Sequence, residues 1–210
     1  MDVRYLWWAV MAASAYGGLQ WFLHERPVAH PFGTLVEETP QIVLRSSRPA
    51  WQDAYGFSYT ARADLDARVV VLARANYSVG EFAGFSPTDL AIAWGPLSDR
   101  SIYEQFKFSE MGSPLAGRFV FPEVRPGTDM AKRPFKEVAD FLLQHLTHVH
   151  TIPGNATVAK TLAGIRPGQV VHLKGVLVDT VAPSRDLYQT SLKLFDYECE
   201  IMWVDQIEFE

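Results

Sequence analysis

An uncharged run of 19 residues near the N-terminus constrains this chain more than any other feature. It covers residues 5–23 (YLWWAVMAASAYGGLQWFL), and as a helix with a rise of ~1.5 Å per residue it would span about 28 Å. This length is close to the ~30 Å hydrocarbon core of a bilayer. Trp7 and Trp8 at one end and Trp21 at the other match the aromatic belts of membrane interfaces. We therefore predict an N-terminal transmembrane anchor over residues 1–26, followed by a soluble domain.

Small residues recur along one side of this predicted helix. Ala9, Ala13 and Gly17 are spaced four apart, so they share one helix face. Small side chains at this spacing let a second helix approach closely. We predict that this face is a helix–helix interface with another transmembrane helix of a membrane complex.

Two alternatives remain for the same run. Arg4 and the sequence ASA at residues 13–15 are compatible with a cleaved signal peptide, and a buried helix of a soluble protein is also possible. The run continues apolar to Leu23, past that cleavage site, which favours a retained anchor. Basic residues stand on both sides of the run, so orientation is weakly encoded. We expect a single-pass protein of a bacterial inner membrane with its soluble domain in the periplasm.

Composition limits the classes of function. The chain has 210 residues, 48% hydrophobic and 20% charged, which is enough for one domain with a sizeable core. Its net charge of −5 disfavours a nucleic-acid partner, because such proteins usually present a basic face. The single cysteine, Cys199, can form neither an internal disulfide nor a Cys-rich zinc site.

The remainder of the chain predicts an α+β domain. Pro-rich residues 27–50 read as an extended connector, and residues 51–210 as the domain, ending in a β-meander over residues 165–210. Gly175 interrupts a strand and predicts a bulge or barrel bend. We expect a bent antiparallel sheet or a small OB- or SH3-like barrel with two or three short helices.

Individual elements follow from periodicity and capping signals. Ser86 and Pro87 resemble a helix start, with Asp89 placed to return a bond to the cap. Strands are predicted over residues 68–77, 117–121, 147–152, 169–181, 188–195 and 200–209, and helices over residues 90–94, 134–146 and 156–162.

Two sequence segments resemble those of a known protein family. They are SPTDLAIAWGPLSD at residues 86–99 and HVHTIP at residues 148–153. Together with the later segments GQVVHLKG and CEIMWV, they resemble a family of uncharacterised bacterial proteins of about 200 residues with an N-terminal membrane segment. The similarity runs from about Gly33 to the C-terminus. The resemblance implies a bacterial, membrane-anchored protein and transfers no activity and no catalytic residue.

Residues 89–99 suggest a small ligand pocket. Trp94 would form a stacking wall, and the carboxylates of Asp89 and Asp99 would anchor polar groups. The alternative is structural: Asp89 completes a helix cap, Asp99 caps the next turn and Trp94 belongs to the core.

Histidines form the densest titratable cluster. If residues 147–152 form a strand, His148 and His150 share a face about 7 Å apart, a spacing that suits zinc or copper. A third ligand would come from His145, His172 or a carboxylate. The alternative is that these histidines are hydrogen-bonded at a helix–strand junction or face water. We predict no resident metal and no cofactor.

No familiar catalytic motif is present. The sequence lacks a nucleophile elbow, a phosphate-binding loop, a dinucleotide fingerprint and a C-x-x-C pair. We therefore assign no catalytic residue and predict a non-catalytic accessory, assembly or interaction subunit of a bacterial membrane complex. The leading alternative is a periplasmic ligand- or metal-binding domain that uses His148 and His150. A hydrolytic enzyme with a triad assembled from distant positions is a third possibility.

Overall fold

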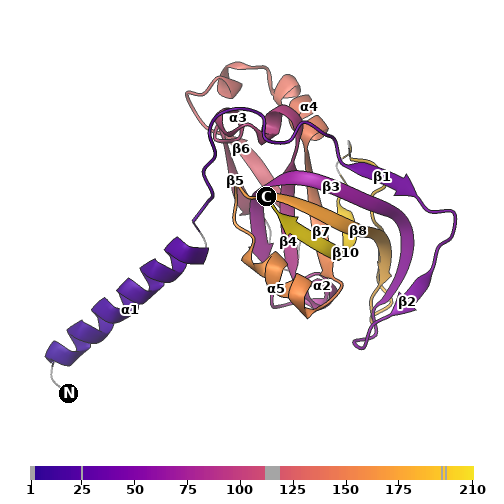
Figure 1. Ribbon diagram of the computed structural model, residues 1–210, viewed down its shortest axis with the longest axis horizontal. Helices are drawn as coiled ribbons and strands as arrows, with labels where there is room; N and C mark the ends of the chain where they lie inside the picture. The colour runs from indigo at the N-terminus through magenta and orange to yellow at the C-terminus, as the bar shows by residue number, and fades with distance from the viewer. Residues whose placement is uncertain (1–2, 25, 112–118, 195, 197) are drawn as a thin grey trace.

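A computed structural model describes residues 3–24, 26–111, 119–194, 196 and 198–210 (Figure 1). Its α-helices are α1 (Val3–His24), α2 (Glu81–Phe85), α3 (Arg100–Tyr103), α4 (Phe135–His145) and α5 (Ala156–Gly164), with short 3-10 helices η1 (Gly95–Ser98) and η2 (Met130–Lys132). The main sheet contains β1 (Gln41–Leu44), β2 (Ala50–Gln52), β3 (Ser58–Asn76), β4 (Thr88–Ala93), β7 (Leu146–Pro153), β8 (Val170–Val181), β9 (Leu187–Tyr188) and β10 (Glu200–Phe209). A separate hairpin pairs β5 (Phe106–Met111) with β6 (Phe119–Val124).

Five strands of the main sheet close on themselves. Hydrogen-bonded neighbours follow one another in the order β3, β4, β7, β10, β8 and back to β3. Every pair in this circuit is antiparallel except β7 with β10, which is parallel. The five strands therefore form a closed barrel within a mixed sheet, with one parallel pair and with α5 preceding β8 in the chain.

The alternation of side chains along β3 explains how the barrel is filled. In the first half of β3, every second residue is buried, including Ala63, Leu65 and Ala67. From Val69 to Leu72 both faces of the strand are buried, as its β-branched run predicted. The barrel interior is therefore a packed apolar core rather than a channel.

Two of the predicted helices are confirmed. α4 covers nearly the predicted range, and α5 extends the predicted range by two residues to Gly164. The side chain of Asn155 accepts a hydrogen bond from the backbone N–H of Val158, which caps the start of α5. Val158 and Leu162 bury the inner face of α5 against β7 and β10.

The prediction of a transmembrane helix is wrong. The N-terminal helix α1 forms and lies apart from the barrel in Figure 1, but within the described ranges no helix is long and apolar enough to cross a membrane. The run is uncharged, yet it contains glycine, serine, glutamine and many Trp and Tyr residues. These residues favour transfer into hydrocarbon much less than Leu, Ile, Val or Phe. The inner-membrane location was inferred from this helix and loses that support.

Three further details of the fold prediction need correction. The sheet is mixed, because the chain passes through α5 and β8 before β10 returns beside β7. Apart from α1, the described chain has four α-helices rather than two or three. Residues 90–94 were predicted to be helical, but β4 is fully buried between β3 and β7, and pairing on both sides decides its conformation.

An irregularity is found at Gly175, as predicted, although the extra residue, Asp205, lies on the partner strand β10. The register of β8 and β10 shifts opposite this residue, and a Cβ there would lie 2.0 Å from the backbone oxygen of Trp203. Since the close approach is to backbone, Gly175→Ala is expected to lower the free energy of unfolding by about 3 kcal/mol in denaturant titrations. Gly164→Ala is the matched control, because a Cβ there meets nothing within 4 Å. Equal stability of the two variants would contradict this account of Gly175.

Candidate functional site

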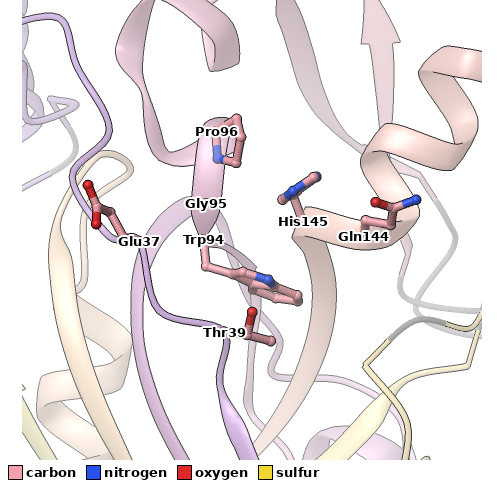
Figure 2. Close-up of a pocket in the computed structure, with 7 residues that line it drawn as sticks. All are labelled: Glu37, Thr39, Trp94, Gly95, Pro96, Gln144 and His145. Atoms are coloured by element: carbon pink, nitrogen blue, oxygen red, sulfur yellow. The ribbon is translucent and has the colours of Figure 1, made fainter.

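Three segments that are distant in sequence meet around a surface pocket of about 450 Å³. The connector before β1, the corner between β4 and η1, and the end of α4 each contribute part of its lining (Figure 2). The lining residues are Glu37, Thr39, Trp94, Gly95, Pro96, Gln144 and His145.

Backbone hydrogen bonds hold these segments together. The N–H of Gly95 donates to the carbonyl of Val36 over 2.7 Å, which fixes the connector on the corner. The N–H of Trp94 donates to the carbonyl of His145 over 3.2 Å, which fixes the end of α4 on the same corner. The buried hydroxyl of Ser98 accepts from the N–H groups of Leu35 and Val36 at 3.1 and 3.0 Å. The pocket is therefore part of the folded framework.

The His145 ring has a defined orientation. Its Nδ1 lies 2.8 Å from the carbonyl oxygen of Phe141, which can only accept, so Nδ1 carries the proton. In the neutral ring, Nε2 then holds the lone pair. Gly95 has φ +57, and a Cβ there would lie 2.8 Å from His145 Cδ2, so the ring is seated against a position that suits only glycine.

The lining combines polar groups at the rim with an aromatic floor. Glu37, Thr39 and Gln144 are exposed, whereas Trp94 is only 1% exposed. Figure 2 shows Glu37 and Gln144 on opposite sides, with Trp94 and His145 between them. None of the lining residues is a lysine or arginine. The arrangement suits a small ligand that is held mainly by hydrogen bonds to the polar groups at the rim.

The three residues predicted to bind a ligand together lie in different surroundings. Trp94 lines the pocket, but Asp89 and Asp99 do not. The carboxylate of Asp99 accepts from the N–H of Ser101 over 2.8 Å and caps α3, as the structural alternative expected. Asp89 is 6% exposed and pairs instead with His150 on β7.

The histidines predicted as metal candidates also lie in different surroundings. Asp89 Oδ1 lies 3.0 Å from His150 Nδ1, and the His150 ring packs against Phe82 at 4.7 Å between ring centroids. His148 is half-buried on the same strand, and His172 pairs with Asp66 on β3. Over the described residues, no group of three or more His, Cys, Asp and Glu side chains could hold a metal ion. The Asp89–His150 pair is a buried contact between neighbouring strands.

Comparisons with family models, curated proteins and solved structures find no match. The resemblance to uncharacterised bacterial proteins therefore stays a hypothesis.

Helix α1 exposes its apolar side chains along most of its length. Residues 5–19 are all exposed, including Trp7, Trp8 and Tyr16, which are 67%, 75% and 65% exposed. Apolar side chains surround this helix on every side, so it has no polar face to turn to water. The predicted interface residues Ala9 and Ala13 lie within this exposed surface.

Sequence reasoning missed an acidic residue in the barrel wall. Glu200 is 0% exposed at the start of β10, and the hydroxyl of Thr147 donates to its Oε2 over 2.5 Å. Its Oε1 is buried and has no hydrogen-bond partner among the residues that the structure describes. Burial raises the pKa of Glu200 to about 8, and it also raises the pKa of the neighbouring Cys199 thiol to about 12. The signal in the sequence was a single acid between Cys199 and the apolar run at residues 201–204.

Glu200 gives a pH-dependent prediction. The folded state favours the protonated form of Glu200. The contribution of this protonation to the free energy of unfolding is therefore complete below the ordinary pKa of 4.5 and is lost as pH rises toward 8. Glu200→Gln mimics the protonated acid, so it is expected to exceed the parent in stability by on the order of 3 kcal/mol above about pH 8.5 and to match it near about pH 4. Thermal unfolding across this pH range measures the difference.

The control for this experiment is Glu208→Gln, which makes the same change at an exposed position of β10. It is expected to leave the pH dependence of stability unchanged. A difference between Glu200→Gln and the parent that stays constant with pH would refute the assignment.

Proposed function

We propose that this protein is a non-catalytic accessory subunit that joins a larger assembly through α1. In the assembly, α1 is covered by an apolar helix of a different protein, and the barrel is carried alongside. The proposal retains the interaction-subunit hypothesis and no longer includes a membrane-spanning segment.

The observation that carries the proposal is the exposure of α1 on all sides. A helix that is apolar all round is typically buried by other protein or by lipid, and large exposed apolar surfaces mark interaction sites. The barrel buries its own apolar side chains in two clusters, and neither contains a residue of α1. Among the described residues, no core cluster covers α1, which supports a cover supplied by another molecule.

The chemistry of α1 restricts the partner. No charged side chain lies between Tyr5 and Leu23, so a partner with charged groups at the contact would leave those charges buried and unpaired. Ala9, Ala13 and Gly17 give the helix its narrowest side, where another backbone can approach most closely. An apolar helix crossing α1 over these three residues fits both conditions.

A photo-crosslinking experiment tests the proposal in cells. A photoreactive amino acid at Ala13 of the full chain is expected to give one covalent adduct with a different protein, identified by mass spectrometry. The same amino acid at exposed Lys132, on the barrel side of the molecule, is expected to give no such adduct.

Substitutions separate a defined interface from non-specific apolar contact. With the crosslinker moved to Tyr16, Ala13→Leu is expected to lower the adduct yield by about tenfold, since the larger side chain blocks close approach. Ala15→Leu makes the same change two positions further along, on another side of the helix, and is expected to retain the adduct. An adduct only with a second copy of this chain, or equal losses in both variants, would contradict the proposal.

A further inference from the structure

We infer that the pocket lined by Glu37, Trp94 and His145 binds a small organic ammonium ion, a primary amine in its charged form. This inference does not depend on α1, because no residue of α1 lines the pocket. Failure of the assembly proposal would therefore leave it untouched.

The pocket is preformed, which is the first requirement for a binding site. The bonds from Gly95 to Val36 and from Trp94 to His145 join its three walls through backbone atoms. The Phe141 carbonyl fixes the ring of His145. A ligand therefore meets groups that are already ordered, and little conformational entropy is lost on binding.

Acceptors dominate the polar lining. The carboxylate of Glu37 only accepts hydrogen bonds when ionised, and Nε2 of neutral His145 also accepts, because Nδ1 carries the ring proton. The side-chain carbonyl of Gln144 and the hydroxyl of Thr39 add two more acceptors at the rim. An ammonium group has three N–H donors and no acceptor, so it complements this set.

The local charge has the matching sign. Glu37 is the one residue in the lining with a full charge when His145 is neutral. Gln144 and His145 stand at the C-terminal end of the 11-residue helix α4, where the helix dipole is negative. A carboxylate ligand would meet repulsion from both sources, whereas a cation is attracted by both.

The remaining surface suits a carbon skeleton. Exposed Pro96 supplies apolar wall next to the acceptors, and Trp94, which is almost completely buried, closes the bottom of the pocket. The volume of about 450 Å³ lies within the range of small-molecule sites. We therefore expect the ligand to carry an aromatic or short aliphatic body beside its charged end.

Three probes of one shape and different charge test the inference on the full chain: phenethylammonium, the neutral phenethyl alcohol and the anionic hydrocinnamate. Isotope-edited NMR follows the indole N–H of Trp94, assigned through Trp94→Phe. We expect phenethylammonium to bind with a Kd of about 1 mM or lower, phenethyl alcohol to bind about tenfold more weakly, and hydrocinnamate to cause no shift. Equal shifts from all three probes, or none from phenethylammonium, would overturn the inference.

Two acidic neighbours provide a matched pair of variants. Glu37→Gln removes the charge from the lining and is expected to weaken phenethylammonium binding by about tenfold. Glu38→Gln makes the same change at the next residue, which is exposed and does not line the pocket, and is expected to leave the Kd unchanged. Both positions are exposed, so neither variant is expected to disturb folding. Equal effects of the two variants would refute the assignment of Glu37.

Discussion

The pairing of β3 with β8 is the constraint on which the rest of the structure depends. It runs from Ser58 opposite Val181 to Val70 opposite Val170, and it closes the circuit that β4, β7 and β10 complete. Closure satisfies the backbone of each strand on both sides and encloses one apolar core. Ala93 at the end of β4 pairs with Val70 of β3 on one side and with Leu146 at the start of β7 on the other, and the pocket is built at that junction. The geometry around Trp94 and His145 is thus a consequence of how the barrel closes.

The apolar side chains of this protein fall into a buried group in the barrel and an exposed group on α1. In the barrel, residues such as Leu65, Ile92 and Met202 are buried by the protein itself. In α1 the apolar side chains of residues 5–19 are exposed, and none of them belongs to the core clusters of the described residues. The barrel therefore buries its own core, whereas we propose that α1 is covered by another molecule. This contrast supports an interaction subunit more strongly than any feature of the barrel, since a fold of this kind hosts many unrelated functions.

Local signals predicted part of this structure. α4 and α5 follow apolar periodicity with clear boundaries, and Gly175 marked the irregularity between β8 and β10. The same reasoning failed at residues 90–94, because a short buried apolar run has no period that separates helix from strand. It also failed for α1, because an uncharged run of sufficient length with aromatic ends still contains many residues that are only weakly apolar. The pocket could not be predicted, because Glu37, Trp94 and His145 meet only through long-range backbone bonds.

The central claim is that α1 is covered by a partner while the barrel folds alone. Hydrogen–deuterium exchange of the full chain, compared in the isolated state and in the complex recovered by crosslinking, tests it most directly. The account predicts that amides of α1 exchange freely in the isolated chain and become strongly protected in the complex, whereas β3 and β8 are protected equally in both. Protection of α1 that is the same in both states, or protection of β3 and β8 that appears only in the complex, would contradict it.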